Sequence, residues 1–147
     1  MSWKSSSKCW RFYVEISGAL RAMKPTSEIS SLHETAMAFA EQALMSPDSL
    51  RAGTLFRSAF EHERQAAELL EDTFDYEPTR SVLYRSAATL ARDCQDYGEA
   101  KRLIQKGLMG RLTEDIAEEL KELLELVHSD ETRGTGPAGL PTPRRRP

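Results

Sequence analysis

The chain lacks a long apolar run and has few cysteines. No stretch of its 147 residues approaches the roughly 18 consecutive apolar residues of a membrane-spanning helix, so no membrane span or membrane partner is predicted. The two cysteines, Cys9 and Cys94, lie far apart and match no zinc or redox spacing. Free thiols in a reducing compartment are the simpler interpretation, and we expect a cytoplasmic protein. With 39% hydrophobic and 29% charged residues, the composition is that of one soluble domain.

The common catalytic motifs are also missing. The sequence has no Gly-rich phosphate loop, no nucleophile elbow and no acid-rich calcium loop. Its histidines, His33, His62 and His128, fall in three different predicted helices without a cysteine nearby, so their spacing predicts no metal site. The acidic run from Glu114 to Glu125 is typical of the solvated face of a helix. We therefore expect no metal and no cofactor.

The net charge of -3 hides an uneven distribution. Residues 1–25 carry five Lys/Arg and one Glu (+4), residues 26–130 carry eleven Lys/Arg and 21 Asp/Glu (-10), and residues 131–147 carry four Arg and one Glu (+3). An acidic body repels phosphate backbones and attracts basic peptides, so nucleic acid is not an expected partner of the folded core. An acidic composition also serves solubility alone, which is the less specific explanation.

The two ends differ in composition from the body. Residues 1–25 are a basic extension, rich in Ser and aromatics, which we expect to be poorly ordered or partly helical. Arg11 and Glu15 interrupt its only apolar stretch and disfavour a secretory signal; a transit peptide and a true start at Met23 are the alternatives. Residues 131–147 are rich in Gly, Pro and Arg and predict a disordered tail. The expected helical domain spans residues 26–130.

Five amphipathic helical patterns fill the body and predict an all-α fold. The first runs from about residue 27 to 45 and ends at Ser46-Pro47-Asp48. The second continues to about Phe74, with no Gly or Pro between Thr54 and Glu77. At 1.5 Å per residue, this pattern predicts one long helix of about 35–40 Å.

Three further helices are expected. Pro78 suits the first turn of the third helix, the fourth runs from Asp96 to Met109, and Thr113 caps a fifth that ends near His128. Gly110 suits a left-handed cap after the fourth helix. The stripes expected to be buried are Leu83, Ala87, Leu90 and Cys94 in the third helix, and Ile116, Leu120, Leu123, Leu124 and Val127 in the fifth.

The body contains an internal repeat. When the chain is shifted along itself by 48 residues, small residues meet small ones and large residues meet large ones on both sides of a turn. Small residues let helix axes approach to about 8–9 Å, so we expect Ala88 and Ala100 at a helix crossing. Gly107 costs roughly 1 kcal/mol in mid-helix, and close packing is its expected reason. The aligned pairs are Ala40/Ala88, Ala43/Ala91, Asp48/Asp96, Ala52/Ala100, Leu55/Leu103, Phe56/Ile104, Ala59/Gly107 and Phe60/Leu108.

This pattern resembles the tetratricopeptide repeat. The resemblance covers about thirty residues, Leu83 to Leu112, and includes the family's inter-helix turn at Asp96-Tyr97-Gly98-Glu99-Ala100. It implies a stack of two antiparallel helical hairpins and a C-terminal capping helix. It also implies that this stack binds a protein or peptide. The family's small and bulky positions fall on Ala88, Ala100, Ile104 and Gly107.

Departures from the family's pattern imply a divergent member. Ala87 and Ala91 replace larger residues, and the proline that ends the motif is absent at Leu112. The period is also 48 residues, where the family repeats every 34. The stretch from Glu77 to Leu124 is similar to a group of uncharacterised bacterial proteins of this repeat-like kind.

The resemblance places the partner-binding residues on the third helix. Arg85 and Arg92 stand seven residues apart on one face, where two guanidinium groups with Thr89 between them can hold a carboxylate. The sequence therefore predicts a clamp for an acidic or C-terminal peptide group. Solvated arginines that pair with nearby acids are the alternative. The full set of expected groove residues is Val82, Arg85, Thr89, Arg92 and Asp93.

We expect a non-enzymatic adaptor, and two other functions stay open. Arg57 and His62 fit the spacing of HEPN ribonucleases, which are small all-helical proteins, so they are the candidate catalytic residues of a nuclease or toxin-type enzyme. On one helix, however, a separation of five residues turns two side chains about 140° apart. A self-associating bundle that closes a homodimer is the third function, because two hairpins are fewer than a solenoid normally needs.

Overall fold

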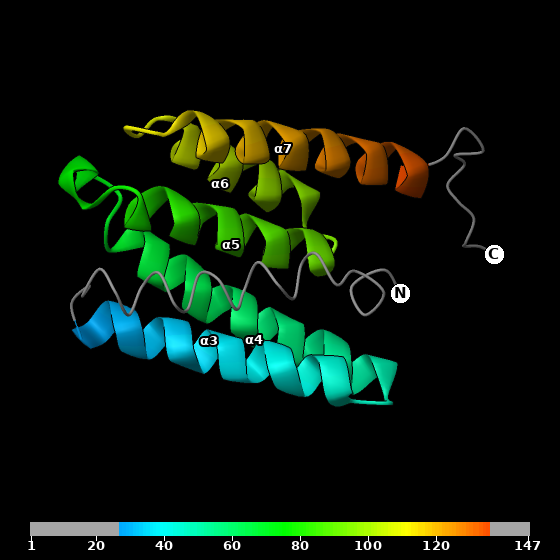
Figure 1. Ribbon diagram of the computed structural model, residues 1–147. Helices are drawn as coiled ribbons and strands as arrows, with labels where there is room; N and C mark the ends of the chain where they lie inside the picture. Colours follow the sequence, from blue (N-terminus) through cyan, green and yellow to red (C-terminus); the bar gives the residue numbers. More distant parts are fainter. Residues whose placement is uncertain (1–26, 136–147) are drawn as a thin grey trace.

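The computed structural model describes residues 27–135, and every regular element in this part of the chain is helical (Figure 1). The elements are α3 (Ser27–Met45), α4 (Ser49–Glu68), the 3₁₀ helix η1 (Phe74–Tyr76), α5 (Thr79–Asp93), α6 (Tyr97–Leu108) and α7 (Glu114–Thr135). The predicted all-α class is therefore confirmed for these residues. None of these helices is long and apolar enough to span a membrane. The predicted N-terminal extension and most of the predicted tail lie outside the described residues.

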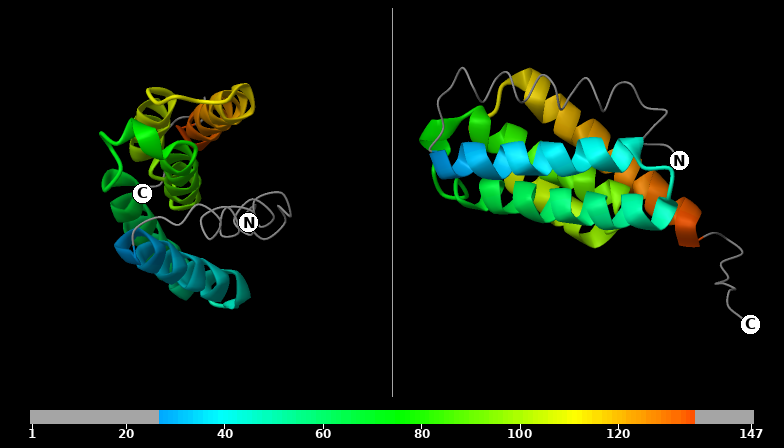
Figure 2. Two further views of the ribbon diagram at one scale, coloured as in Figure 1. Left: turned by 60° about the vertical axis from the view of Figure 1, so that its left-hand side comes forward. Right: turned by 90° about the horizontal axis from the view of Figure 1, so that it is seen from below.

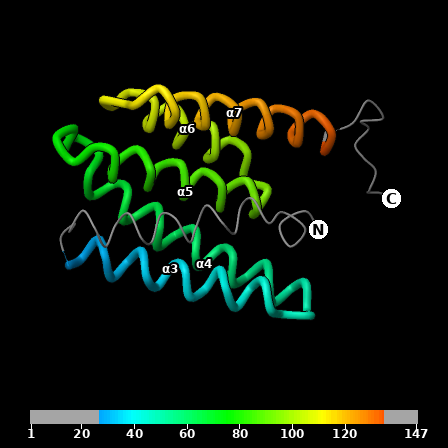
Figure 3. The backbone as a smooth tube through the Cα atoms, in the orientation of Figure 1, coloured from blue at the N-terminus to red at the C-terminus, as the bar shows by residue number. Residues whose placement is uncertain are grey.

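Consecutive helices run in opposite directions and pack on one another (Figure 3). The result is a curved stack, in which α3, α5 and α7 lie on the inner side and α4 and α6 on the outer side (Figure 2). One buried core passes through all five α-helices, from Ile29 in α3 to Val127 in α7. This arrangement leaves the inner faces of three helices around one concave side.

The helix starts follow local capping chemistry. The Asp48 side chain accepts a hydrogen bond from the backbone N–H of Leu50 at the start of α4, and Asp96 accepts one from Glu99 at the start of α6. Thr113 Oγ1 accepts a hydrogen bond from the backbone N–H of Ile116, 3.3 Å away. The predicted starts of the fourth and fifth helices are thus confirmed to within a residue.

The prediction of one long second helix is wrong. α4 ends at Glu68, and tight backbone hydrogen bonds follow, such as Leu70 N–H to Ala67 O at 3.0 Å. Leu70 is still buried, so the apolar stripe continues although the helix does not. The Arg80 side chain binds the carbonyl oxygen of Glu71, 2.9 Å from Nε, and stabilises the non-helical backbone there. A tertiary contact thus accompanies the end of the helix in a stretch that contains no local helix breaker.

Gly110 does not form the predicted left-handed cap, because its φ is not positive. The reason for glycine at this position is space: a Cβ there would collide with the Glu77 carboxylate and lie 2.8 Å from Arg80 Nη1. The left-handed residue of the described chain is instead Gln95, with a φ of 63°, between α5 and α6. The turn between α5 and α6 therefore contains a backbone conformation that glycine prefers.

We predict that Gln95→Gly raises the free energy of unfolding by about 0.5–1 kcal/mol, because glycine adopts positive φ without a Cβ clash. Chemical denaturation measures the change. Gln105 is an exposed residue inside α6, so Gln105→Gly is the matched control and should lower stability by about 1 kcal/mol. Loss of stability in both variants would contradict the strain assigned to Gln95.

Small residues lie where helices approach closely, as the sequence predicts. Ala88 and Ala100 are fully buried in the neighbouring helices α5 and α6. A Cβ on Gly107 would lie 3.2 Å from both Tyr84 Cβ in α5 and Leu120 Cδ1 in α7. The packing reason expected for Gly107 is confirmed, since three helices meet at this position.

α7 is longer than predicted. It continues past His128 to Thr135, so the helical part extends beyond the expected boundary at residue 130. Ion pairs explain the extension, because Lys101 Nζ lies 2.8 Å from Glu131 Oε1 and Arg133 pairs with Asp130. These ion pairs thus stabilise a helix in residues that their composition predicts to be part of a disordered tail.

Candidate interaction groove

A groove of about 730 Å³ lies at one end of the stack, which we call the end groove. Its lining residues come from the α3–α4 turn and the start of α4, the α5–α6 turn and the last turns of α7. These segments all lie at the same end of the stack (Figure 1). Its apolar lining includes Ala43, Pro47, Ala52 and Phe56, and its polar lining includes Arg92, Asp93, Tyr97 and Asp130. The end groove therefore combines an apolar surface with a few charged groups, as peptide and ligand sites do.

The arginine at the edge of the end groove is held by a carboxylate of α7. Arg92 Nε lies 2.5 Å from Asp130 Oδ2, and Arg133 pairs with the same carboxylate. Asp130 thus lies between two guanidinium groups, which fixes the C-terminal part of α7 against α5. The charges of this cluster are largely satisfied within the protein.

Asp93, which also lines the end groove, has a carboxyl oxygen that is not satisfied in this way. Its Oδ2 atom is buried and has no hydrogen-bond partner, although the residue as a whole is partly exposed. Burial raises the pKa of the Asp93 carboxyl to about 8; Arg92 lowers this pKa and Asp130 raises it, both by smaller amounts. The Oδ2 atom can accept a hydrogen bond from a bound molecule, because it has no hydrogen-bond partner within the described residues.

The raised pKa of Asp93 makes stability depend on pH. The folded protein holds this proton more tightly than the unfolded chain, so the free energy of unfolding should fall as pH rises from about 4 to about 8. Asp93→Asn removes this contribution, and its stability should change less across that range than that of the unmodified protein. Urea denaturation at several pH values measures the slopes. The exposed Asp72, changed to Asn, is the control; equal slopes in the unmodified protein and Asp93→Asn would contradict the burial.

The predicted partner-binding residues divide between two places. Arg92 and Asp93 line the end groove. Val82, Arg85 and Thr89 do not: Val82 packs partly buried against the core, and the Thr89 hydroxyl donates to the carbonyl oxygen of Arg85, 2.9 Å away. The sequence places all five on one helix, but only the C-terminal end of α5 opens into the groove.

The two arginines of the predicted clamp are engaged within the chain. Arg85 pairs with Glu119, and Arg92 pairs with Asp130, both on α7. A carboxylate ligand would have to displace these acids from both guanidinium groups. The pairing expected as the alternative is present, and the arrangement favours a ligand that donates to Asp93 over one that accepts from the arginines.

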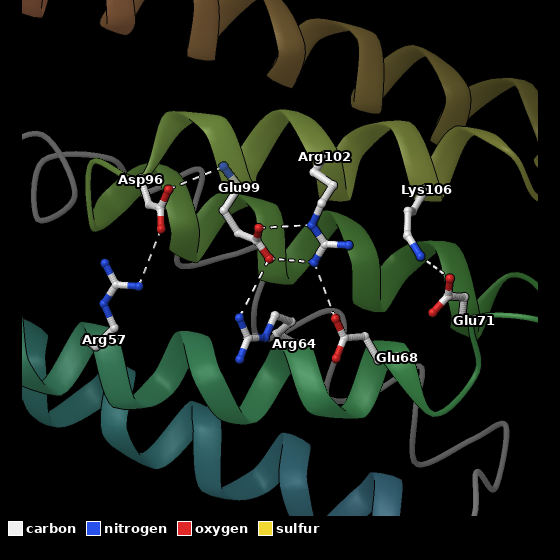
Figure 4. Close-up of polar contacts among 8 residues, drawn as sticks. All are labelled: Arg57, Arg64, Glu68, Glu71, Asp96, Glu99, Arg102 and Lys106. Carbon is white, nitrogen blue, oxygen red and sulfur yellow. Dashed lines mark hydrogen bonds and ion pairs between the residues drawn. The ribbon is translucent and has the colours of Figure 1, made fainter.

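On the outer side, four ion pairs connect α4 and the turn after it with α6 (Figure 4). α4 and α6 run in the same direction, and their charges reverse sign along them, from basic to acidic on α4 and from acidic to basic on α6. The pairs are Arg57–Asp96 at 3.6 Å, Arg64–Glu99 at 3.7 Å, Glu68–Arg102 at 3.3 Å and Glu71–Lys106. We call these pairs the outer ladder.

The outer ladder fixes the two hairpins relative to each other. Hydrogen bonds from Arg102 lower the pKa of Glu99, and those from Lys106 lower the pKa of Glu71, so both acids are charged over the neutral range. A shift of α6 along α4 by one turn would bring one pair of like charges together, Arg64 with Arg102 in one direction or Glu68 with Glu99 in the other. The helical spacing of these charges is visible in the sequence, but the identity of the facing helix is not.

The two candidate catalytic residues of the predicted nuclease, Arg57 and His62, lie on different sides of α4. His62 Nδ1 lies 2.8 Å from Ser58 O and its ring lies 5.5 Å from that of Phe39 in α3, whereas Arg57 lies 3.6 Å from Asp96 on the other side of α4. Within residues 27–135 no group of three or more His, Cys, Asp or Glu could hold a metal ion. Burial raises the pKa of the Cys94 thiol to about 11, so a reactive thiolate is disfavoured.

The end groove thus combines an apolar surface with an unsatisfied polar atom, Asp93 Oδ2. It was not visible in the sequence, because its lining comes from three separate parts of the chain. Comparison of the chain with protein-family models, with curated proteins and with solved structures gave no match.

Proposed function

We propose that the protein is a non-enzymatic interaction module, a divergent tetratricopeptide-repeat-like stack, that binds a peptide segment of a protein partner in the end groove. The curved stack of antiparallel hairpins supports this proposal, as do the small residues at the helix contacts. A volume of about 730 Å³ is also within the range of ligand sites. The proposal concerns binding and assigns no chemical step to the protein.

The observation that carries the proposal is the buried Oδ2 atom of Asp93, which has no hydrogen-bond partner. Buried polar atoms nearly always have one, and leaving one unsatisfied costs about 1–3 kcal/mol. A peptide N–H, a lysine or an arginine in the groove would recover this free energy. Apolar side chains of the same peptide would pack on the exposed part of the lining at Pro47, Ala52 and Gly53.

A variant that fills the end groove tests the proposal. Gly53 lines it, and a Cβ there would meet no atom within 4 Å, so Gly53→Arg should leave α4 intact and place a bulky cation in the groove. Gln105→Arg, on an exposed position of α6 outside the groove, is the matched control. Affinity capture with the full chain should recover a specific partner with the unmodified protein and the control, and not with Gly53→Arg.

The same preparations distinguish the other functions. Equal recovery by both variants would place the partner elsewhere and overturn the proposal. RNA cleavage by the purified protein that is lost in His62→Ala would favour the nuclease. A dimer in sedimentation experiments that dissociates in Gly53→Arg would favour the self-associating bundle.

A further inference from the structure

The Asp93 carboxyl group indicates which chemical group a partner brings to the end groove. We propose that the end groove holds a lysine side chain of the partner, with its ammonium group on the Asp93 carboxylate. The inference rests on the proposed function and deepens it, because it names the group by which a peptide segment is recognised. It differs from the clamp that the sequence predicts, since it assigns recognition to an acid and not to the arginines.

The two acids that line the end groove differ in their partners. Asp130 lies 2.5 Å from Arg92 and also pairs with Arg133, so its charge is compensated within the protein. Asp93 Oδ2 is buried and has no hydrogen-bond partner among the described residues. Asp93 as a whole is partly exposed, and the torsion of its carboxyl group is soft and two-fold, so a rotation presents either oxygen to the groove. A charged donor would form a stronger hydrogen bond there than a neutral donor would.

The charged groups around Asp93 come from two helices. Arg92 is its neighbour on α5, and Asp130 and Arg133 face the end groove from α7. Within the part of the chain that the structure describes, α3, α4 and the turn between them contribute uncharged residues to the lining. Burial raises the pKa of Tyr97 on α6, so this phenol stays neutral near pH 7. Both arginines are bound to Asp130, which leaves Asp93 as the acid that a bound cation would meet.

The stem of a lysine and the charge of the stack support the same proposal. Pro47, Ala52 and Gly53 form an accessible apolar part of the lining, on which methylene groups can pack while the ammonium reaches an acid. Residues 27–135 carry twelve Lys/Arg and 22 Asp/Glu, a net charge of -10, which attracts a basic segment. An ammonium is also compact, whereas the fork of a guanidinium requires more acceptors than one unpartnered oxygen.

The proposal fixes the direction of a pH dependence. Burial raises the pKa of Asp93 to about 8, so the groove without a ligand holds a proton at neutral pH. The ammonium binds the ionised carboxylate, and binding therefore releases this proton. The apparent affinity should rise by up to about tenfold per pH unit below the raised pKa and level off above it. A lysine itself stays charged over this range, because its pKa is about 10.4.

Nuclear magnetic resonance of the full chain tests the proposal, with N-acetyl-lysine methylamide as the probe. The probe should shift the backbone amide signals of Gly53, Asp93 and Gln95, which line the end groove, and not that of Gln105 on α6 outside it. The norleucine analogue has the same stem without the ammonium group, and it should bind at least about tenfold more weakly at equal ionic strength. Unchanged groove signals at about 100 mM probe would overturn the proposal, and so would equal binding of the two compounds.

A variant of Asp93 separates the carboxylate from the rest of the groove. Asp93→Asn keeps the size of the side chain, and far-ultraviolet circular dichroism checks that the helices are retained. This variant should bind the lysine probe about tenfold more weakly or less, without the rise in affinity between about pH 6 and pH 8. The exposed Asp72, changed to Asn outside the groove, is the matched control and should bind as the unmodified protein does. Equal affinity of Asp93→Asn and the unmodified protein would overturn the assignment to Asp93.

This proposal and the proposed function fail separately. The probe reports the lysine site without any partner, and affinity capture reports the partner. Probe binding without a captured partner would retain the lysine site and remove the proposed function. A partner whose capture is lost in Gly53→Arg and kept in Asp93→Asn would retain the proposed function and remove the lysine anchor.

Discussion

Replacing Arg80 by methionine is expected to lower the free energy of unfolding by about 3–5 kcal/mol, the cost of removing one member of a buried charged network. The Arg80 side chain is 1% exposed. Its Nη2 atom donates to the carbonyl oxygen of Lys106, 3.0 Å away, and its Nε donates to that of Glu71, 2.9 Å away. The substitution would leave both carbonyl groups without this donor, and methionine cannot replace it.

The same arginine also holds a carboxylate and two aromatic rings. Its Nη1 atom lies 3.5 Å from Glu77 Oε2, and its guanidinium carbon lies 4.7 Å from the centre of the Phe74 ring and 5.0 Å from that of Tyr84. Arg80 thus connects the end of α4, the start of α5 and the end of α6. Loss of these contacts should loosen the junction of the two hairpins and not only one helix.

Chemical denaturation measures the effect, with Arg111→Met as the control. Arg111 lies 3.1 Å from Asp75, but both side chains are largely exposed, so its removal should change stability by less than about 1 kcal/mol. Similar values for the two variants would show that Arg80 is not the connection described here. Arg80→Lys should recover little, because an ammonium group lacks the fork that reaches two carbonyls and a carboxylate.

The regular part of this structure could be predicted from periodicity and local chemistry. The stripe from Ile29 to Ala43 gives α3 its observed range, and Asp96 marks the start of α6 because it both ends an apolar stripe and can cap a helix. Buried alanines and Gly107 indicate close helix contacts, because small residues let helix axes approach. Each of these features depends on residues near one another in the chain.

The features that escaped prediction depend on residues far apart in the sequence. α4 ends at Glu68 because Arg80 binds the backbone after it, and glycine is required at position 110 because Glu77 and Arg80 lie beside it. The end groove needs three separate parts of the chain at the same end of the stack. Arg85 and Arg92 were correctly placed on one helix, but their partners on α7 are 34 and 38 residues away. No local pattern contains such information.

The outer ladder and Arg80 have a common consequence for binding. Both act between the hairpins, and both limit rotation of α3 and α4 against α5 and α6. The end groove has one wall from each hairpin, so its width depends on this rotation. A groove held at fixed width avoids part of the ordering cost when a peptide binds.

The buried pair inside the first hairpin should be as sensitive as Arg80. His33 Nδ1 in α3 lies 3.0 Å from both carboxylate oxygens of Glu63 in α4, and both side chains are almost completely buried. Glu63→Ala is expected to lower the free energy of unfolding by about 3–5 kcal/mol, because it leaves the imidazole buried without this acceptor and opens a cavity. Thermal and chemical denaturation measure the loss.

Replacing both members of the pair should give a different result. In the double variant His33→Leu, Glu63→Met, apolar side chains of similar size meet between α3 and α4, and stability should return close to that of the unmodified protein or exceed it by about 1–4 kcal/mol. The two single changes would then be strongly non-additive, as expected of side chains in direct contact. A double variant that loses the sum of the single effects would mean that the two side chains contribute independently and are not coupled, which would contradict this account of the pair. Recovery would show that α3 and α4 need a matched, space-filling contact here, which the histidine and glutamate provide only together.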